Sequence, residues 1–592
     1  MSNVTTYIGG DSFREFMTRH RTYVDKTGLI EELLASDQPQ VSLITRPRRF
    51  GKTLALSMLK EFFAIEGDSA ALFAGLSVSN NKALCAAWMN AFPVIFLTLK
   101  EMKKRCFQSA LAELAETLVD ICIEHKYLLS SPRVDEDDRT VLARLKAKEY
   151  SETLLSSALQ RLCRALKMHW EKPVIVLIDE YDAPIEAAYV HGFYEEMIDF
   201  MRSFLGRALK SAAYLQCALL TGCLRIAKES IFTGINNFAC YTLDDDRFSD
   251  KFGFTETEVC QLLEKGQCSD KQKIVKEWYD GYRFGRNTEI YCPWDIMNYL
   301  YDLQQNPDIS PKPYWMNTSG NDIIRNYFGV SDRRIRKKIE SLINAGSVEA
   351  TIVDTCTYDT LKAVLSLSSA FSSTSAALDI SQDISTDALW SMLYFTGYLT
   401  KRKTTEERAE RSLATRQDET SFRKHELVLP NKEIQEICVR YVDEWFEKSV
   451  QMRDNSALFT AFWQGDAKVF TEEMNALLST RISYYSYKES YYHGFLTGLF
   501  GLSEFEVCCE REAGLGRLDM FVEDEEHGRV AIIELKRAER QDLLPLRAEE
   551  AVEQIRSRRY DEVIGRKHGD VLCWGMAFWK KRCVSTCCTF KN

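Results

Sequence analysis

Three consecutive residues of this 592-residue chain, Gly51, Lys52 and Thr53, could bind the phosphates of a nucleotide. They end the run TRPRRFGKT, which follows the apolar segment VSLIT and opens an amphipathic stretch, so the context is strand, loop and helix. In that context backbone N–H groups surround the phosphates, the lysine reaches the terminal phosphates and the threonine hydroxyl binds Mg²⁺. The sequence therefore predicts a phosphate-binding loop for ATP and Mg²⁺.

The basic residues of this loop allow two interpretations. Arg46 stands where the motif GxxxxGK[ST] has its first glycine, so the spacing is kept but the glycine that eases the turn is missing. Arg46, Arg48 and Arg49 could contact phosphate oxygens, and a solvated basic loop is an equally good explanation. We count Arg46 and Arg49 as nucleotide contacts, together with Phe50 and Leu54, which flank the glycine–lysine–threonine run.

A second acidic motif follows a predicted buried strand. In VIVLIDEYDAP, apolar residues lead to Asp179 and Glu180. Asp179 is predicted to bind Mg²⁺, and Glu180 to orient or polarise an attacking water. Acidic residues that merely end a strand are the alternative, which is weaker when both motifs occur in order. Farther on, LQCALLTG ends near Thr221, and Arg225 after it is either a sensor of the γ-phosphate or a surface cation beyond a simple turn.

A separate group near the C-terminus consists of Asp519, Glu534 and Lys536. The strand VAIIELK places Glu534 and Lys536 two residues apart and so on one face. Asp519 lies on the preceding apolar strand, and antiparallel pairing could bring its carboxylate beside Glu534. The two carboxylates could hold Mg²⁺ or Mn²⁺, which activates water and stabilises charge on a phosphodiester. This predicts a metal-dependent nuclease-type site in which Lys536 positions the nucleophile or screens charge.

Two further side chains could belong to this site. Glu489, on the helix YKESYYHGFLTGLF, could complete the metal ligands, and Gln554 on the following helix could position phosphate or water. His493, one turn after Glu489, is predicted to be hydrogen-bonded and not catalytic. The alternative for Glu534 and Lys536 is a weak surface ion pair at a strand end. Nearby arginines could hold a phosphate backbone, although interleaved glutamates make many of them an ordinary charged helix face.

The elements that position these residues fall into three regions. Residues 1–245 alternate short apolar runs with longer amphipathic ones, as in a parallel sheet covered by helices. Residues 246–480 have an α-rich pattern, with a winged-helix-like fold as one option, and their charged stretch KTTEERAERSLATRQDETSFRKHE is predicted to be a solvated hairpin or loop. Residues 481–592 follow the order αβββαβ. We expect a multidomain α/β protein.

Composition narrows the classes of function. A formal charge of -10 and a pI of about 5.6 exclude a surface that is basic throughout, so any DNA contact is local. The 18 cysteines are scattered, which favours reduced thiols and disfavours structural zinc. The N-terminus has no basic-then-apolar pattern, and we find no run of roughly 18 apolar residues that could span a membrane. These observations predict a cytoplasmic protein without membrane contact.

The motifs together resemble one two-part family: AAA-ATPase-like proteins of bacteria and archaea that carry a C-terminal PD-(D/E)XK nuclease domain. The marks of the resemblance are TYVDKTGLIEELL, RPRRFGKT, VIVLIDEYDAP, TGCLRIAKESIFTGINNF, WYDGYRFG, LPNKE, YYHGFLTGLF, GRLDMFVED, IIELK and EQI followed by Tyr560. The resemblance implies a P-loop ATPase module of the additional-strand kind and a restriction-endonuclease-like module. Arg46 in place of glycine is usual for this family, whereas Leu518 replaces the proline of the PD motif.

Three hypotheses follow from these residues. The first is an ATP-binding, ATP-hydrolysing protein that regulates a metal-dependent DNA nuclease domain. The second is a nucleotide-dependent switch whose C-terminal fold binds nucleic acid or protein without cutting, and the third is a purely structural assembly that does not bind ATP. Homo-oligomer formation is compatible with each of them.

Overall fold

The computed structural model describes residues 4–6, 8–210, 213–225, 231–232, 235–285, 288–315, 333–353, 379–402, 424–452, 455–479, 489–501, 505–513, 516–559 and 570–590. The chain forms two compact units. One consists of Met1–Ile324 and Ser347–Ile437, and the other of Arg325–Gly346 and Cys438–Asn592. The predicted domain boundaries after residues 245 and 480 stay predictions.

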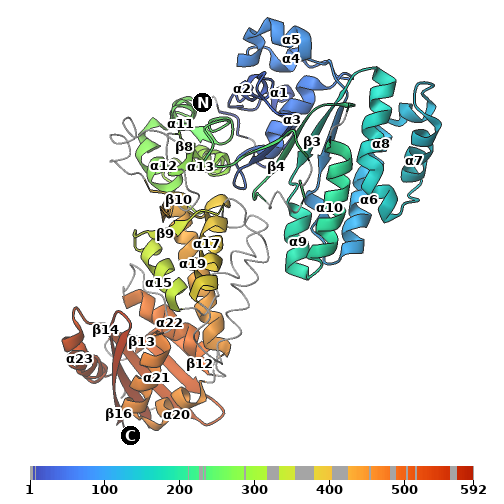
Figure 1. Ribbon diagram of the computed structural model, residues 1–592. Coiled ribbons are helices and arrows are strands. Elements are labelled where there is room, and N and C mark those ends of the chain that lie inside the picture. Colours follow the sequence, from blue (N-terminus) through green and yellow to red (C-terminus); the bar gives the residue numbers. More distant parts are fainter. Residues whose placement is uncertain are drawn as a thin grey trace. The chain divides into compact units, whose positions relative to one another are not determined.

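A five-stranded parallel sheet lies at the centre of the N-terminal part of the chain (Figure 1). Its strands are β1 (Val41–Thr45), β2 (Val94–Thr98), β3 (Val174–Asp179), β4 (Leu215–Gly222) and β5 (Phe238–Tyr241). They lie in the order β2-β3-β4-β1-β5, so β4 stands between the strand before the loop and the strand that ends at Asp179. This is the additional-strand arrangement, and the predicted α/β fold is confirmed.

Helices cover both faces of this sheet, as a parallel sheet requires. They include α3 (Lys52–Phe63), α6 (Phe107–Glu124), α8 (Glu152–Trp170), α9 (Ala183–His191) and α10 (Tyr194–Leu209), and α7 (Glu136–Lys146) packs on α6 and α8. Leu56 and Leu59 of α3 share a core with Ile175 and Leu177 of β3. Figure 1 shows α3 on one side of the sheet and α8 and α10 on the other. The helix that begins in the phosphate-binding loop is therefore fixed against the sheet along its length.

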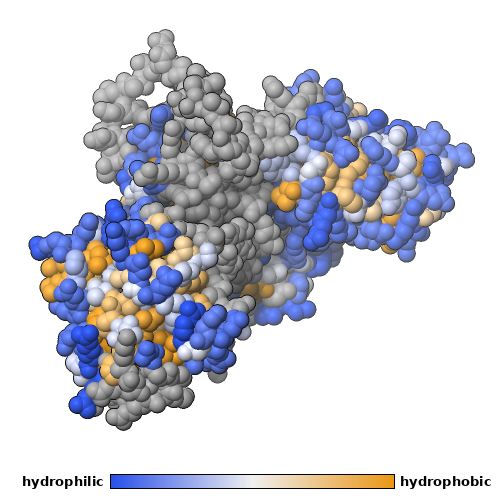
Figure 2. Space-filling view, turned by 90° about the horizontal axis from the view of Figure 1, so that it is seen from below, coloured by the Kyte–Doolittle hydropathy of each residue, from blue (hydrophilic) through white to orange (hydrophobic). Residues whose placement is uncertain are grey.

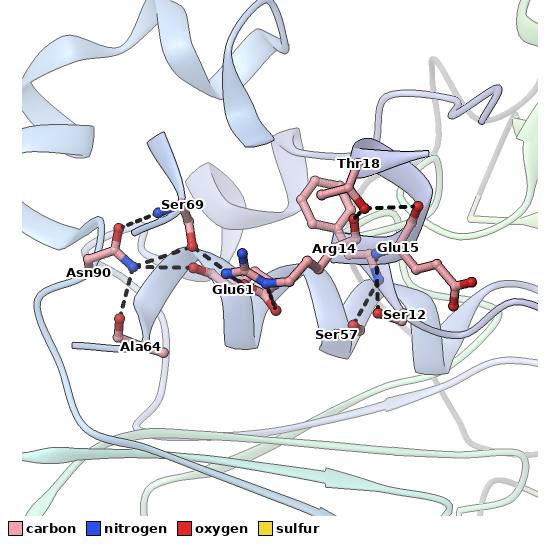
Figure 3. Close-up of polar contacts among 10 residues, drawn as sticks. Ser12, Arg14, Glu15, Thr18, Ser57, Glu61, Ala64, Ser69 and Asn90 are labelled. Atoms are coloured by element: carbon pink, nitrogen blue, oxygen red, sulfur yellow. Dashed lines mark hydrogen bonds and ion pairs between the residues drawn. The ribbon is translucent and has the colours of Figure 1, made fainter. Parts of the chain in front are cut away.

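The N-terminal segment holds α3 from its outer side (Figure 3). In α1 (Phe13–Thr18), the backbone N–H of Phe13 donates to Ser57 Oγ at 3.0 Å, and Arg14 Nε donates to Glu61 Oε1 at 3.1 Å. The Asn90 amide donates to the carbonyl of Ala64 at 2.8 Å, just beyond the end of α3. Other small helices here are α2 (Gly28–Leu33), α4 (Ala70–Phe73) and α5 (Lys82–Trp88).

The middle region is rich in helices, as predicted. Its helices are α11 (Glu256–Lys265), α12 (Gln272–Tyr279), α13 (Pro293–Gln305), α15 (Arg333–Ile343), α17 (Asp379–Phe395) and α19 (Lys432–Met452). One small antiparallel sheet has the order β6 (Phe254–Thr255), β8 (Thr288–Tyr291), β7 (Tyr282–Phe284). Another has the order β10 (Thr400–Lys401), β11 (Lys424–Val428), β9 (Val348–Thr351). Most of the predicted charged hairpin, 403–423, lies outside the described residues, and the winged-helix option stays a prediction.

The C-terminal part contains a mixed five-stranded sheet in sequence order. Its elements are α20 (Ser456–Gln464), α21 (Ala467–Ser479), α22 (Glu489–Gly501), β12 (Glu506–Ala513), β13 (Gly516–Asp524), β14 (Arg529–Arg537), α23 (Leu544–Ser557), β15 (Val571–Trp579) and β16 (Arg582–Phe590). Neighbouring strands are antiparallel except β14 and β15, which are parallel. The predicted αβββαβ order is confirmed, and β16 extends it by one strand that the sequence analysis did not identify.

The surface of the described residues mixes polar and apolar side chains. Figure 2 shows hydrophobic residues gathered in places and bordered by hydrophilic ones. Among the large hydrophobic residues, Leu546, Ile123 and Val190 are the most exposed. In the described ranges, no helix is both long enough and apolar enough to cross a lipid bilayer.

Candidate functional sites

The phosphate-binding loop joins the end of β1 to the start of α3. Gly51 caps α3 with a φ of 85°, a left-handed conformation that glycine adopts without strain. A methyl group added at Gly51 would touch nothing within 4 Å, so the backbone angle and not crowding favours glycine. The unpaired N–H groups of the first helical turn give this end of α3 the property of an anion site.

The predicted catalytic groups of the loop converge on Asp179. Thr53 Oγ1 donates to Asp179 Oδ2 at 2.6 Å, and Thr221 Oγ1 donates to Asp179 Oδ1 at 2.6 Å. Lys52 Nζ donates to the carbonyls of Arg46 and Pro47 at 2.9 and 2.8 Å. The structure thus brings together Lys52, Thr53, Asp179 and Thr221 at the carboxyl ends of β1, β3 and β4.

Glu180 follows β3 in a conformation that is unfavourable for its residue type. Its φ is 50°, in the left-handed region, which costs on the order of 1–2 kcal/mol for a residue with a side chain. Such strain is retained only where the neighbouring structure enforces it. The strain places a half-buried carboxylate directly after the end of the strand that carries Asp179.

The residues after Glu180 enforce this geometry by binding the end of β4. The buried Tyr181 hydroxyl donates to the Leu224 carbonyl at 2.6 Å. Asp182 Oδ2 accepts the N–H groups of Cys223 and Leu224 at 2.8 and 2.9 Å. Sequence reasoning missed these contacts, because nothing in the DEYD run shows which later segment it meets. They fix the position of Arg225, which is half-buried just beyond β4.

We expect Gly222→Ala to weaken the chain and its nucleotide site together. A Cβ at this position would lie 2.7 Å from the Tyr181 ring and 2.8 Å from Asp182 Oδ1. Relief of such overlap in a packed core costs roughly 1–3 kcal/mol. The measurement is the thermal unfolding midpoint together with nucleotide affinity. Gly206→Ala, where an added Cβ meets nothing within 4 Å, is the matched control, and equal behaviour of the two variants would contradict the expectation.

Arg46 has a role that neither sequence interpretation included. Its guanidinium is fully buried and donates to the carbonyls of Thr45, Thr242 and Phe248 at 2.8, 2.8 and 3.1 Å. Burial lowers its pKa to about 10. The segment after β5 presents carbonyl groups that need donors, and Arg46 supplies them. Arg46 therefore anchors the loop from inside, and its buried guanidinium is directed at these carbonyl groups, which disagrees with the predicted phosphate contact.

The other predicted loop residues lie against the middle region. The exposed Arg49 stacks over the Trp294 ring, with its guanidinium carbon 4.1 Å from the ring centroid. Phe50 is buried against Tyr282, with ring centroids 5.0 Å apart, so it is a packing residue. Leu54 is half-buried on the first turn of α3 beside the core of the sheet.

Two buried carboxyl groups lie behind the loop, and sequence analysis gave no sign of them. Asp295, in the first turn of α13, contacts Glu433, in the first turn of α19. Burial raises the pKa of Asp295 to about 6, and burial together with the Asp295 charge raises the pKa of Glu433 well above its usual value. The two carboxyl groups form a hydrogen bond with each other, which requires a proton on one of them.

This acid pair is connected to the backbone of the loop. The N–H of Trp315 donates to Glu433 Oε1 at 2.9 Å, while its indole N–H donates to the Arg48 carbonyl at 3.4 Å. The thiol of Cys292, three residues before Asp295, donates to the Arg49 carbonyl at 3.7 Å. Residues that contact the acid pair thus also bind the backbone of the loop.

In the C-terminal sheet, Asp519 and Glu534 lie on neighbouring strands. The register pairs Met520 with Ile533, and continuing it by one step places Asp519 opposite Glu534. Lys536 Nζ lies 3.8 Å from Glu534 Oε1 and donates to Gln554 Oε1 at 2.6 Å, while the Gln554 amide donates to Glu534 Oε1. Leu535 turns to the other face and packs in a separate core. The structure brings together all four predicted residues Asp519, Glu534, Lys536 and Gln554.

The surroundings of Glu534 fit a cation site. Its side chain is buried, and its Oε2 atom has no hydrogen-bond partner. Burial, followed by the nearby Asp519 carboxylate, raises the pKa of Glu534 to about 7. A divalent cation would satisfy the unpaired oxygen and offset the repulsion between the carboxylates. The donor set therefore fits Mg²⁺ or Mn²⁺.

The helix before the sheet supports Asp519 through its backbone. His493 Nε2 donates to the Asp519 carbonyl at 2.7 Å, which agrees with the prediction of a hydrogen-bonded histidine. Asp519 Oδ2 accepts the N–H of Leu535 at 2.8 Å. Glu489 begins α22, but its side chain lies outside the described residues. Within the described part, no group of three or more His, Cys, Asp and Glu side chains is placed to hold a metal ion.

Protein-family models match the two segments that carry the candidate sites. Residues 7–232 match the family model described as Predicted AAA-ATPase, and residues 487–586 match the PD-(D/E)XK nuclease superfamily. A curated relative from Azotobacter chroococcum mcd 1, titled "Uncharacterized protein in vnfD 5'region", is 28% identical over 297 residues. The match covers 50% of this chain and 50% of the relative, so the chain spans about half the length of that relative.

A match to a solved structure spans a large part of the chain. It is a signal transduction ATPase with numerous domains (STAND) protein with a tetratricopeptide repeat sensor from Pyrococcus horikoshii. The match is 12% identical, covers 80% of this chain and 56% of that one, and has a TM-score of 0.21, too low to support an argument. The two family matches do agree with the sites described above: this chain carries an AAA-ATPase-like domain, followed by a domain of the PD-(D/E)XK nuclease superfamily.

Proposed function

We propose that the chain binds and hydrolyses ATP at its N-terminal site and thereby regulates metal-dependent cleavage of DNA by its C-terminal domain. The observation that carries the proposal is the arrangement of Asp519 opposite Glu534, whose buried Oε2 has no partner. The Lys536–Gln554–Glu534 contacts hold a cation and an amide beside those carboxylates. This is a site for a divalent ion and a phosphodiester.

At the nucleotide site, each residue has a role that fits its present contacts. Lys52 exchanges its two carbonyl partners for phosphate oxygens, and Thr53 and Asp179 hold Mg²⁺. Glu180 orients a water for attack, and Thr221 keeps Asp179 in place. Arg225 at the end of β4 contacts the terminal phosphate.

At the nuclease site, Asp519 and Glu534 hold the divalent ion, with Glu489 as a further ligand. When bound, that ion supplies an activated water and stabilises negative charge on the phosphate. Lys536 screens charge at the scissile phosphate, and Gln554 fixes the positions of both Lys536 and Glu534. We propose DNA as the partner of this domain and a homo-oligomer as an assembly to be tested. We propose the cytoplasm as the location, since none of the 17 described cysteines forms a disulfide bond.

The test is an assay of purified protein with DNA, ATP and either Mg²⁺ or Mn²⁺. We expect cleavage by the wild-type chain, none by Asp519→Asn or Lys536→Ala, and altered cleavage by Lys52→Ala, which also loses ATP binding. Arg540→Ala, which removes an exposed cation beyond β14, is the control for loss of charge alone. DNA that stays intact while ATP still binds through Lys52 would replace the nuclease proposal with the non-cleaving switch.

A further inference from the structure

A cluster of three charged side chains lies at the edge of the sheet that carries the nucleotide site. Glu186 accepts Arg48 Nη2 on both carboxylate oxygens at 2.8 Å, and its Oε2 also accepts Lys103 Nζ at 3.1 Å. Arg48 belongs to the phosphate-binding loop, and Lys103 follows the short helix η2 (Lys100–Met102) after β2. Glu186 lies in the first turn of α9, directly after the DEYD run. The cluster therefore joins the segments that follow β1, β2 and β3.

The Arg48–Glu186–Lys103 cluster lies on segments that border the predicted nucleotide site. In the sheet register Thr98, the last residue of β2, pairs with Asp179, so the segment that carries Lys103 begins beside the predicted magnesium ligand. Arg48 precedes Gly51 by three positions, within the segment whose N–H groups would surround the phosphates. Both cations come from segments that border the predicted position of the terminal phosphate.

Carboxylate charge holds both cations of the cluster. Burial acts to raise the pKa of Glu186, and the positive charges of Arg48 and Lys103 outweigh it and keep that pKa below its usual value. The Asp182 carboxylate acts on Arg48 as a further negative charge. A phosphate oxygen is also an anion and could take the place of Glu186, and arginine and lysine are the usual residues for such contacts.

The cluster is also open to a ligand, unlike Arg46. The side chains of Arg48, Glu186 and Lys103 are 21%, 17% and 33% exposed. An ion group that served only to support the core would be expected to be closed off, as the Arg46 guanidinium is. The exposure allows Arg48 and Lys103 to exchange Glu186 for another anion without unfolding their segments.

We propose that Arg48 and Lys103 bind the terminal phosphate of a nucleoside triphosphate, and that Glu186 holds both cations when this phosphate is absent. The inference rests on the proposed ATP site and deepens it by naming the residues that distinguish a triphosphate from a diphosphate. Because Glu186 lies on α9, the exchange also links the presence of the terminal phosphate to the attachment of that helix.

The experiment compares the affinities of a non-hydrolysable ATP analogue and of ADP, each with Mg²⁺, by titration calorimetry on the full chain. Lys103→Gln is expected to weaken the analogue about 5- to 10-fold, as for loss of one charged contact, and ADP less than about 2-fold. Glu186→Gln is expected to change the ratio in the opposite direction, because it frees both cations. Lys104→Gln, which breaks a neighbouring ion pair of similar exposure with Glu113, is the control and leaves the ratio unchanged.

The outcomes separate this inference from the proposed function. If the variants change the affinities for both nucleotides equally, or if Lys103→Gln and Glu186→Gln change the ratio in the same direction, the cluster is structural and the inference fails while the ATP site stands. If the wild-type chain binds neither nucleotide, both the site and the inference fail. If the Glu186→Gln chain does not fold, the affinity ratio of Lys103→Gln, compared with that of Lys104→Gln, tests the inference.

Discussion

Replacement of Glu534 by glutamine is expected to stabilise the metal-free protein at pH 8 while abolishing DNA cleavage. Burial and the Asp519 charge raise the pKa of Glu534 from 4.5 to about 7 in the folded chain. A shift of this size corresponds to about 3 kcal/mol between the protonation states. The wild-type chain has the full contribution of this group below pH 4.5 and loses it as the pH rises through 7. Glutamine remains neutral throughout, so the variant escapes that loss.

Metal ions should reverse the difference in stability between the wild-type chain and the Glu534→Gln variant. Mn²⁺ or Mg²⁺ stabilises the ionised form of Glu534, so the thermal midpoint of the wild-type chain should rise on metal addition, and the rise should grow from pH 6 to pH 8. The Glu534→Gln variant should show little rise at either pH. The readout is thermal unfolding across pH, with and without metal. Glu525 is exposed in the turn before β14, so Glu525→Gln is the control and should follow the wild-type pH profile. If Glu534→Gln also followed the wild-type profile, the proposed effect of Glu534 ionisation on stability would be contradicted.

Local pattern was sufficient to predict the residues just described. Period-two alternation placed Glu534 and Lys536 on one face, and the structure puts Leu535 in the opposite core. In residues 1–245, the alternation of short apolar runs with longer amphipathic ones predicted a parallel sheet, and the structure confirms it. Both features could be predicted because the order of residue types along the chain shows them without knowledge of distant contacts.

The features that were missed depend on segments far apart in the chain. The role of Arg46 depends on carbonyls that follow β5, and the Tyr181 and Asp182 contacts depend on the end of β4. No local pattern announces such partners, because a buried arginine and a loop arginine have the same sequence signal. The strand β16 was missed for a different reason: its alternation is broken by polar residues on the half-buried face.

The Asp295–Glu433 pair is the clearest case of a feature that local sequence pattern cannot predict. Each acid lies in the first turn of a different helix, where acidic residues are common. Each would be read from the sequence as an exposed acid that favours a helix N-terminus. Only the fold reveals that they meet in a buried place behind the phosphate-binding loop. The destabilisation that results from burying these two acids therefore depends on tertiary structure. We also expect it to affect the nucleotide site.

Asp295→Asn is expected to remove a loss of stability that the wild-type chain suffers as the pH rises. Burial raises the pKa of Asp295 from 3.8 to about 6, so the group contributes fully below pH 3.8 and its contribution is lost as the pH passes 6. The shift corresponds to about 3 kcal/mol at pH 8. An asparagine amide stays neutral and can donate to Glu433. Unfolding measured at pH 5, 6.5 and 8 should show the variant gaining on the wild type with pH.

The groups around the Asp295–Glu433 pair decide whether ionisation of the pair changes the nucleotide site. Cys292, Tyr282 and Arg49 face Asp295, and of these only Arg49 carries a charge that favours its ionised form. Since Trp315 and Cys292 bind carbonyls of the loop, ionisation of the pair should loosen the loop as well. ATP affinity of the wild-type chain should therefore fall between pH 6 and pH 8, and Asp295→Asn should reduce that fall. Exposed Asp308→Asn is the control, and an identical pH dependence in all three chains would show that the pair does not act on the loop.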